Sequence, residues 1–489
     1  MLTPTKKLLF ALALLVGLSA RQPLWAQNNK TTYTLQECID QALQNNLSVR
    51  QRIINKEISV AELRQAKASL LPNINGSASH NYNYGTNIDQ ATYEVRRDQT
   101  RTNNFSLGAS LPLFMGNQRL NNIKQSSLDL QASEQDILAT KNDVAIQVVT
   151  SYLNILFAEE LIKTAELQRS STQQQLDRNR ILLKAGSIAE NVVLEVESQL
   201  ATDELNIINA QNQGDIARIS LKQLLGINNN EPLTIVVPEI PEPDERATPI
   251  NPNEVYEYAL NNLPAIKGAD LRILSADRGL AVARGAYYPR LTFSGGVNSF
   301  YTSRGVLYSQ SAVEPGKLAS ETLGFIDAAG TIPFMLYSPV IPAFIEEPYP
   351  FTDQVKNNFG QQMGFSLSLP IFNGLQTRTN VERARLNHLN ARINADIARN
   401  NLRQTIEQAG VDALAAQRKY AAAKRQLAAL QRNYDNAQVR LERGIINPVD
   451  FNVIVNNFRV SQSNLIQAKY EYTFKLKVLD FYQGKPLTL

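Results

Sequence analysis

The side chains that most often carry catalysis or bind metals are scarce in this sequence. Its 489 residues contain one cysteine, Cys38, and two histidines, His80 and His388. Acid–base catalysis most often uses histidine, and transition-metal sites need several histidine or cysteine ligands at short spacing. The sequence also has no glycine-rich phosphate-binding loop. We therefore expect no catalytic site, no metal site and no cofactor, and a protein that is not an enzyme.

Cys38 cannot form an intramolecular disulfide, because the chain has no second cysteine. An extracellular protein normally uses its cysteines in such pairs. The residues before it, Leu35-Gln36-Glu37, lack the small side chains of a lipoprotein processing site. We interpret Cys38 as a buried thiol and not as a site of lipid attachment.

Residues 1–26 have the pattern of a secretory signal peptide. Lys6 and Lys7 precede 11 apolar residues, 8–18, and Ala26 is a small residue at a cleavage position. Such a run is too short to cross a bilayer as a helix, which takes about 20 residues. The alternative is a short buried helix. Without this segment the basic residues fall from 49 to 46 against 45 acidic residues, a net charge of +1. The basic composition therefore does not indicate nucleic-acid binding.

The chain contains two similar halves. Residues 111–118 read LPLFMGNQ, and residues 369–376, 258 positions later, read LPIFNGLQ. The same offset pairs three glycines: Gly116 with Gly374, Gly186 with Gly444, and Gly226 with Gly484. Upstream, an offset of 217 pairs Pro72 with Pro289, so the second half carries an insertion of 41 residues. Self-similarity at fixed spacing indicates a repeated structural unit.

We therefore divide the mature chain into repeat 1, residues 27–227, a linker, 228–254, and repeat 2, 255–489. The linker contains six prolines, which forbid a continuous helix, and we expect it to lie extended against the surface. Each repeat should contain a helix, a β-hairpin, a long helix, a tip and a returning helix. In repeat 1 we expect the β-hairpin at 73–114, the long helix at 117–183 and, after the tip, the returning helix at 188–226. In repeat 2 we expect the β-hairpin at 290–372, with an extended loop at 304–356. The long helix is expected at 375–442 and, after the tip, the returning helix at 449–483.

The long helices carry an apolar seam that repeats every seven residues. In repeat 2 its two lines are Leu402, Ala409, Ala416, Ala423, Leu430 and Ala437, and Ile406, Ala413, Tyr420, Leu427, Tyr434 and Leu441. This heptad pattern predicts a helix that packs along its length against another helix. Residues 117–183 contain no proline or glycine. At 1.5 Å per residue, a helix of this length extends over about 100 Å.

Four segments alternate like strands and contain no charged side chain: 73–84, 103–114, 291–301 and 358–372. Each is long enough to be a tilted transmembrane strand, which takes about 9–11 residues. Alternation of apolar and polar side chains, with aromatic residues near the strand ends, is typical of outer-membrane barrels. A strand of a soluble β-sandwich alternates in the same way, so any single segment leaves that alternative open.

Four strands cannot close a barrel, because a filled one takes about eight. Open edges are forbidden in lipid, where each unpaired backbone group costs several kcal/mol. Several copies must therefore share one barrel. Two copies would give about eight strands and a filled interior, and three would give about twelve and an aqueous lumen. The polar inner faces favour three, so we expect an α+β membrane protein that forms a homotrimer in the lipid outer membrane.

The opening TLQECIDQALQNN, the doubled strand pairs, the doubled long helices and the doubled glycine tips resemble the TolC-type outer-membrane efflux family. The resemblance covers essentially the whole mature chain. It implies four strands per chain in a shared 12-stranded barrel, and long antiparallel coiled-coil helices that form a periplasmic tunnel. It also implies docking of a periplasmic adaptor protein and an inner-membrane transporter. The expected function is the outer-membrane exit duct of a tripartite efflux or secretion system.

The resemblance places the adaptor-docking surface at two helical tips, residues 184–191 and 442–450. The residues expected there are Gly186, Ser187, Ile188, Ala189 and Glu190 in the first tip and Gly444, Ile445, Ile446, Asn447 and Pro448 in the second. Both glycines suit the positive φ that ends a helix. We expect the three isoleucines to be exposed and therefore to need a partner.

The family's second tip carries acidic residues that ring the constriction of the tunnel, and Asp450 matches the first of them. Val453 stands where a second acid would be expected. The resemblance thus implies a single ring of three carboxylates at the pore constriction, which attracts cations less than a double ring. The structural alternative for Asp450 is the N-cap of a helix after Pro448.

The insertion falls between the third and fourth strands, so we expect it outside the cell. It is interpreted either as a loop packed against its symmetry mates or as a contact with another surface protein. The alternative to a duct is a trimeric membrane-anchored surface adhesin or scaffold without transport. Small toxic molecules, peptides and secreted proteins are equal candidates for the transported substrate.

Overall fold

A computed structural model describes residues 32–88, 95–228, 230–238, 242–243, 251–310, 318–325, 329–331, 333–339 and 344–485. The expected signal peptide, 1–26, lies outside these residues. The chain divides into two compact units, which are described separately. Unit 1 consists of Met1–Glu57, Ala132–Asp270 and Asn394–Leu489, and unit 2 of Ile58–Gln131 and Leu271–Ile393. Each unit contains residues from both halves of the sequence, so the units cut across the expected repeats.

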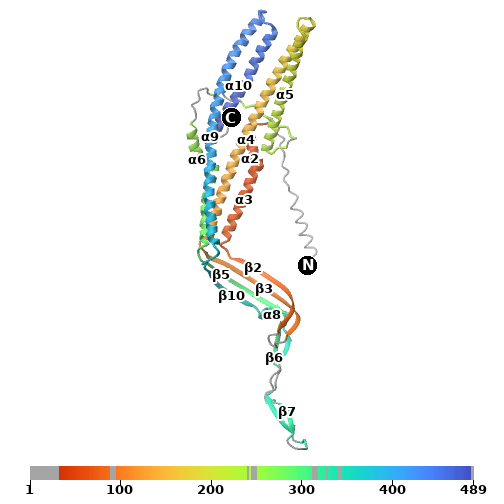
Figure 1. The fold of residues 1–489 in the computed structure, drawn as a ribbon, viewed down its shortest axis with the longest axis vertical. Helices are drawn as coiled ribbons and strands as arrows, with labels where there is room; N and C mark the ends of the chain where they lie inside the picture. The colour runs from red at the N-terminus through yellow and green to blue at the C-terminus, as the bar shows by residue number, and fades with distance from the viewer. Residues whose placement is uncertain are drawn as a thin grey trace, which may run out of the picture. The chain divides into compact units, whose positions relative to one another are not determined.

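Each half of the chain contains four long or short helices in the same order, with matching lengths (Figure 1). The first half contains α2 (Leu35–Asn45), α3 (Leu47–Ala68), α4 (Gln118–Lys184) and α5 (Glu190–Leu225). The second half contains α6 (Pro252–Asn262), α7 (Pro264–Gly285), α9 (Gln376–Glu442) and α10 (Pro448–Tyr482). Their lengths are 11, 22, 67 and 36 residues in the first half and 11, 22, 67 and 35 in the second.

Four of these helices end at a glycine with positive φ: Gly186, Gly226, Gly444 and Gly484. At the end of α4, the backbone N–H of Ser187 donates to the carbonyl of Leu182 at 2.9 Å. The N–H of Ile445 donates to Arg440 in the same way at the end of α9. This is the Schellman ending, which requires a left-handed residue and therefore favours glycine. The positive φ predicted for the two tip glycines is confirmed.

The core of unit 1 forms around α4. Val148, Tyr152 and Ile155 of α4 pack with buried residues of α2 and α5, including Cys38 and Leu221. Cys38 is fully buried, as we expected for a thiol without a partner.

The first part of the linker is built into this core. Strand β4 (Thr234–Ile235) pairs in parallel with β1 (Thr32–Tyr33). Leu233 and Ile235 are buried, and the Tyr152 hydroxyl donates to the carbonyl of Val236. Our expectation of a linker lying on the surface is wrong for these residues, because the alternating side chains of Leu233 and Ile235 are buried in the core. Residues 239–241 and 244–250 of the linker lie outside the described residues.

The predicted apolar seam faces partner helices within unit 1. Its buried members on α9 are Leu402, Ile406, Ala409, Ala413, Ala416, Tyr420 and Ala437. Tyr420 stacks on Tyr472 of α10, with the ring centroids 6.1 Å apart, and Leu479 of α10 packs against the alanines at 409 and 413. The heptad prediction of helix pairs is confirmed, and alanine at many seam positions lets α9 and α10 approach closely.

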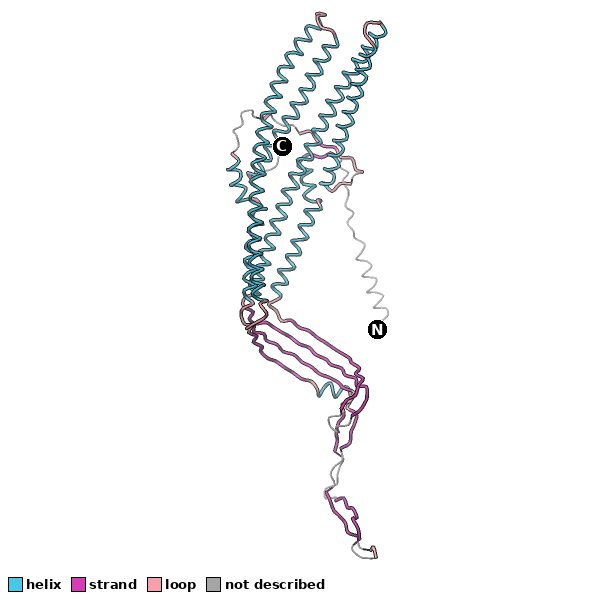
Figure 2. The backbone as a smooth tube through the Cα atoms, viewed as in Figure 1, coloured by secondary structure: helices cyan, strands magenta, loops and turns pink. Residues whose placement is uncertain are grey.

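The four predicted strands form one antiparallel sheet in unit 2, in the order β10-β5-β3-β2 (Figure 2). The strands are β2 (Asn73–Ile88), β3 (Val95–Met115), β5 (Arg290–Thr302) and β10 (Gly360–Ser368). LPLF, 111–114, belongs to β3, but LPIF, 369–372, lies beyond the end of β10. The partner strand explains the difference. The register that pairs Ser368 with Arg290 would place residue 369 opposite Pro289, which has no N–H to donate.

The described part of the insertion is not the extended loop that we expected at 304–356. Strand β6 (Val306–Gln310) pairs with β9 (Phe344–Pro348), and β7 (Leu318–Phe325) pairs with β8 (Pro333–Pro339). Pro333, Pro339 and Pro348 stand at the ends of these strands, where a missing N–H disrupts no ladder.

A short helix, α8 (Phe351–Asn357), follows these strands and packs on β5. Its Gln354 is buried and satisfies the backbone of Thr302 on both sides, accepting from the N–H at 3.0 Å and donating to the carbonyl at 2.9 Å. The ring of Phe351 lies against Tyr301 and Phe105, with centroids 5.1 and 6.4 Å away.

The burial of Cys38 predicts a native protein that resists thiol reagents. Burial, and then the negative charge of Glu37, raise the pKa of the thiol to about 12. Relative to an exposed cysteine, the thiolate fraction at pH 8 falls by about three orders of magnitude. We expect no maleimide labelling of the folded chain at pH 8 and full labelling after denaturation, measured by mass spectrometry. Ser187→Cys, at an exposed tip, is the matched control, and native labelling of Cys38 at the control's rate would contradict this packing.

Candidate functional site

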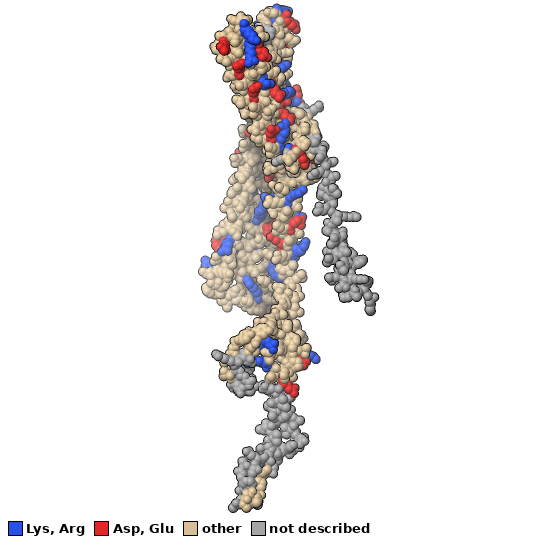
Figure 3. Space-filling model, turned by 90° about the vertical axis from the view of Figure 1, so that its right-hand side faces the viewer, with Lys and Arg blue, Asp and Glu red and all other residues tan. Residues whose placement is uncertain are grey.

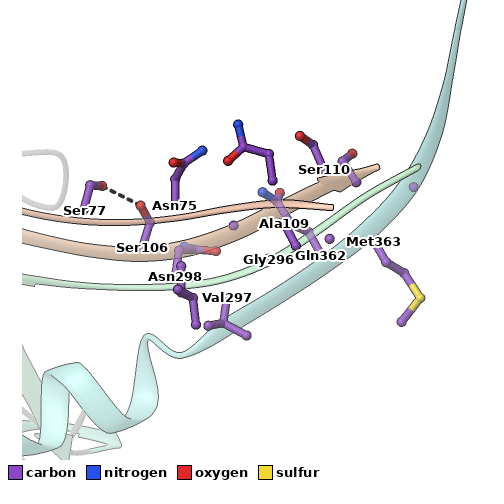
Figure 4. A pocket seen from close by; sticks show the side chains of 16 residues that line it. Asn75, Ser77, Ser106, Ala109, Ser110, Gly296, Val297, Asn298, Gln362 and Met363 are labelled. Atoms are coloured by element: carbon purple, nitrogen blue, oxygen red, sulfur yellow. Dashed lines mark hydrogen bonds between the residues drawn. The ribbon is translucent and has the colours of Figure 1, made fainter. Parts of the chain in front are cut away.

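The two faces of the sheet in unit 2 differ in chemistry. Cross-strand register places Ser77 opposite Ser106, Ser106 opposite Asn298, and Asn75 opposite Gly108, so these residues share one face. The Ser77 and Ser106 hydroxyls are 2.7 Å apart and hydrogen-bonded (Figure 4). We define the polar face by eleven of the sixteen residues that line a groove of about 580 Å³: Asn73, Asn75, Ser77, Ser106, Gly108, Ser110, Ser294, Gly296, Asn298, Gln362 and Gly364. The other five, Leu107, Ala109, Gly295, Val297 and Met363, have the alternation of the opposite face.

The opposite face of the sheet is apolar. Phe105, Leu107 and Val297 line a groove of about 510 Å³ there, and α8 covers the Phe105 end. On β10, Phe365 and Leu367 are 71% and 61% exposed. The charged residues of the sheet, Arg96, Arg97, Asp98, Arg101 and Arg290, lie near strand ends. Between them, a sheet with one polar face and one apolar face suits a wall between water and lipid.

The sheet has two open edges among the described residues, formed by β2 and β10. The outer N–H and C=O groups of an edge strand are available to pair with a further strand. Helix α3 precedes β2 and helix α9 follows β10, and the parts of these helices next to the sheet belong to unit 2. A second sheet edge could therefore extend this wall in either direction.

The structure places the predicted tip residues at the turns between α4 and α5 and between α9 and α10. Charged side chains of both signs gather at this end of the helices (Figure 3). Ile445 is 63% exposed, whereas Ile188 and Ile446 are half-buried. Our expectation of three exposed isoleucines is therefore wrong for two of them. Ala189 is the N-cap of α5 and makes no side-chain capping bond.

Asp450 lies in the first turn of α10 and is exposed. Its backbone N–H donates to the side-chain oxygen of Asn447 at 2.9 Å, and the Asn447 amide donates back to its carboxylate at 2.6 Å. Asn447 is thus the N-cap and Asp450 is the third helical residue, so the alternative that made Asp450 the N-cap is wrong. The first bond is the one that an N-cap side chain makes, and the second joins the two side chains. Val453, one turn along α10, is 46% exposed.

A ladder of uncharged polar side chains joins the two helical hairpins in unit 1. Asn452 of α10 donates to Gln174 of α4 at 3.1 Å, and one turn further Asn456 donates to Gln168. Thr164 of α4 donates to Ser463 of α10 at 2.6 Å, lower down. Sequence reasoning missed this ladder, because its residues lie outside the apolar seam and no periodic signal marks them.

A second polar contact lies inside the first hairpin. Asp203 of α5 is buried and accepts hydrogen bonds from Thr172 of α4 at 2.6 Å and from Gln199 at 3.0 Å. In the second hairpin the offset of 258 places Leu430 and Ser461 at this level, and about one turn nearer the tip Tyr434 stacks on Phe458 with centroids 5.1 Å apart. The two hairpins therefore share their length but not their interior.

Two further observations bear on chemistry and on membranes. In the part of the chain that the structure describes, no group of three or more His, Cys, Asp or Glu side chains could hold a metal ion. One described helix, α4, contains an apolar window long enough to cross a membrane, and 44% of that window is buried in the protein. The buried residues 144–156 of α4 belong to the core of unit 1, so packing accounts for the apolar composition.

The comparisons with known proteins point to one family. The profile of the family described as outer membrane efflux protein matches residues 38–227 and 353–485. Residues 228–352, which include the linker and most of the insertion, fall outside the match.

Among known relatives, the toxin and drug export protein A of Aggregatibacter actinomycetemcomitans is 24% identical over 268 residues, which are 54% of this chain and 56% of that protein. The chain thus spans little more than half the length of this relative. Outer membrane protein TolC of Escherichia coli K12 is 23% identical over 90% of this chain and 79% of its own length. Among solved structures, the CmeC outer membrane channel of Campylobacter jejuni superposes with a TM-score of 0.69 at 19% identity, covering 93% of this chain and 87% of that one. This likeness shows the fold.

Proposed function

The chain belongs to the outer membrane efflux protein family, and on this premise we propose that it is the exit duct of a tripartite efflux or secretion system. Substrates would pass from an inner-membrane transporter and a periplasmic adaptor through the duct to the cell exterior. The observation that carries the proposal is the sheet, whose segments 73–88, 102–115, 291–302 and 360–368 contain no Asp, Glu, Lys or Arg. It is polar on one face and apolar on the other, and two of its strands lead into helices of 67 residues.

The open edges of the sheet support a homotrimer. Four strands leave the edges of β2 and β10 unpaired, which lipid does not tolerate. Three copies would give about twelve strands with an aqueous lumen, and the polar face of the sheet suits such a lumen. In this arrangement the apolar face meets the outer-membrane lipid.

The long helices would extend the duct into the periplasm. Each of α4 and α9 has 67 residues and is about 100 Å long. Their tips would then lie far from the outer membrane, where an adaptor could reach them. Residues 1–26 would direct export, consistent with the membership of an outer-membrane family.

The tips would dock the adaptor. The proposed surface is the tip set Gly186, Ser187, Ile188, Ala189, Glu190, Gly444, Ile445, Ile446, Asn447 and Pro448. Ile445 supports this role most directly, since an exposed apolar side chain at a helix turn gains from burial against a partner. Asp450, exposed on the first turn of α10, would contribute one carboxylate per copy to a ring of three at the constriction.

The alternative is a trimeric surface adhesin or scaffold that anchors in the membrane without transport. Such a protein needs no aqueous lumen, so its barrel would be sealed. Ion conductance of the purified protein in a planar bilayer separates the two functions. The transported substrate is proposed only as a class that the lumen admits: small toxic molecules, peptides or secreted proteins.

The ring of carboxylates predicts a change in ion selectivity when Asp450 loses its charge. We expect Asp450→Ala and Asp450→Asn both to lower the cation preference of single channels at low salt. The effect should fade near 1 M salt, where the Debye length is about 3 Å. Asp450→Asn is the matched control for the cap, because an amide oxygen can still accept from Asn447. Unchanged selectivity in both variants would remove Asp450 from the constriction.

The docking role predicts that a tip substitution separates conductance from efflux. We expect Ile445→Asp to conduct normally in planar bilayers, because the barrel is untouched. In cells that lack the native copy, the same variant should fail to restore resistance to exported toxic compounds, because a buried carboxylate opposes adaptor contact. Ile445→Val should restore resistance. Full rescue by Ile445→Asp would show that this tip does not dock a partner.

A further inference from the structure

The internal duplication indicates how neighbouring copies meet, and the starting point is a contact within one chain. In unit 2 the end of α7 packs against the start of α4. Gln118 of α4 donates to the carbonyl of Val282 at 3.0 Å. Further along, Gly279 lies so close to Gln125 that a Cβ there would be 3.3 Å from its side-chain amide. The two helices therefore run antiparallel and in contact at this end.

The duplicate of this surface is exposed. Helix α9 begins after Gly374 as α4 begins after Gly116, and the two glycines have φ values of 61° and 57°. A Cβ on Gly116 would overlap the backbone of Gly285, the last residue of α7. A Cβ on Gly374 would have no other residue within 4 Å, its chain neighbours aside. The same junction is thus filled in one repeat and open in the other.

The order of the strands shows what could fill it. The inner strands β5 and β3 adjoin α7 and α4, which touch each other. The edge strands β10 and β2 adjoin α9 and α3, so these two helices stand at opposite edges of the sheet. If copies close a shared barrel, edge strands of adjacent copies meet, and α9 of one copy comes beside α3 of the next.

We propose that the start of α9 in one copy packs against the end of α3 in the next copy, in the way that α4 packs against α7 within one copy. The occupant of the exposed surface is therefore a second copy of this chain. The proposal rests on the proposed function, since it requires the shared barrel, and it adds the residues that meet.

The sequence offsets transfer each contact to the new interface. An offset of 258 converts Gln118 to Gln376, and an offset of 217 converts Val282 to Gln65. Gln376 keeps the side-chain amide of Gln118. The acceptor at Val282 is a backbone carbonyl, so Gln65 can supply the same acceptor in the next copy. Gln376 and Gln65 are both exposed in the single chain.

The contact between Gln125 and Gly279 has counterparts of opposite charge. The same offsets convert Gln125 to Arg383 and Gly279 to Glu62. A neutral contact within the chain thus becomes a pair of opposite charges between copies. Both side chains are exposed, and within the described residues neither has an ion-pair partner. Complementary charge across an interface fixes its register and disfavours wrong partners.

The sheet gives a second check. Within the chain Ser110 pairs with Ser294 and Ser106 with Asn298. The offsets convert these pairs to Ser368 with Ser77 of the next copy, and Gly364 with Asn81 of the next copy. By the alternation of each strand, all of these residues lie on the polar face. A shift of one residue would turn the polar side of β2 toward the apolar face, so the transferred register keeps each face continuous across the boundary.

The proposed contact between copies differs from the contact within one chain at the end of the helices next to the sheet. Ala68 stands where α7 has Gly285, and a Cβ on Gly285 would overlap Gln118. The contact between copies must therefore be wider there by about a methyl group. Glu62 lies six residues before Ala68, about 9 Å along α3. The pair of Glu62 and Arg383 is accordingly the better place for a test.

The test is disulfide trapping in the full chain in outer membranes, with Cys38 left in place because it is buried. In Glu62→Cys/Arg383→Cys, mild oxidation followed by alkylation should give bands of two and three linked copies on a non-reducing gel. In Glu62→Cys/Arg385→Cys these bands should be lost, because residues two apart face different sides of a helix. Gln125→Cys/Gly279→Cys should link within one chain and add no higher band.

A charge exchange gives a second readout. Glu62→Arg and Arg383→Glu should each lower the temperature at which the oligomer dissociates in detergent, and the double variant should recover it. The interface is contradicted if the Glu62–Arg383 pair fails to link while the within-chain pair links, or links no better than the pair with residue 385. It is also contradicted if the double exchange recovers nothing. Conductance of the wild-type protein separates the failures: a conducting channel without these links contradicts the interface alone, and a non-conducting one contradicts the proposed function.

Discussion

The constraint on which the rest depends is the hydrogen bonding of the sheet's two edges. A backbone N–H or C=O in the interior of a bilayer must be paired within the protein, and each failure costs several kcal/mol. The four-stranded sheet of this chain leaves β2 and β10 open on their outer sides. Its faces cannot serve a soluble core either, since one exposes large apolar side chains on β10 and the other is lined by Asn and Ser. In the proposed trimer, further copies of the chain would pair both edges and enclose the polar face.

The helices follow from the same constraint. Each strand of the sheet adjoins a helix, so a closed barrel carries a ring of helices below it. Helices 67 residues long need support along their length, and they obtain it from apolar seams within each hairpin and from the amide ladder between hairpins. The polar contact of Asp203 with Thr172 and the aromatic stack of Tyr434 on Phe458 show that two hairpins of one length can be packed by different chemistry.

Local signals allowed most of this fold to be predicted from the sequence. Heptad spacing located α4 and α9, and a glycine at a fixed offset located each helix end, because both properties depend on residues close in sequence. The predictions failed where distant partners decide. LPLF is a strand and LPIF is not, since only the first lies opposite paired residues of β5. The insertion was expected as a loop, because the two sequence offsets reveal only its length, whereas its strands pair with each other in the structure.

The candidate site was predictable in kind but not in detail. The tip glycines carry a conformational requirement that can be read from their offset, whereas the half-burial of Ile188 and Ile446 depends on how each turn folds back. The role of Asn447 as the cap of α10 was likewise missed, since the cap was sought after Pro448, at Asp450, and Pro448 is itself the first helical residue. The polar ladder had no sequence signal, because amide side chains at these positions look like any solvated face.

The most direct measurement of the central claim is the native mass of the mature protein, extracted from outer membranes in mild detergent. A shared barrel predicts a single species of three copies, with no monomer at equilibrium. A stable monomer in the same extract would contradict the account, because its β2 and β10 edges would have to persist in the bilayer without partners.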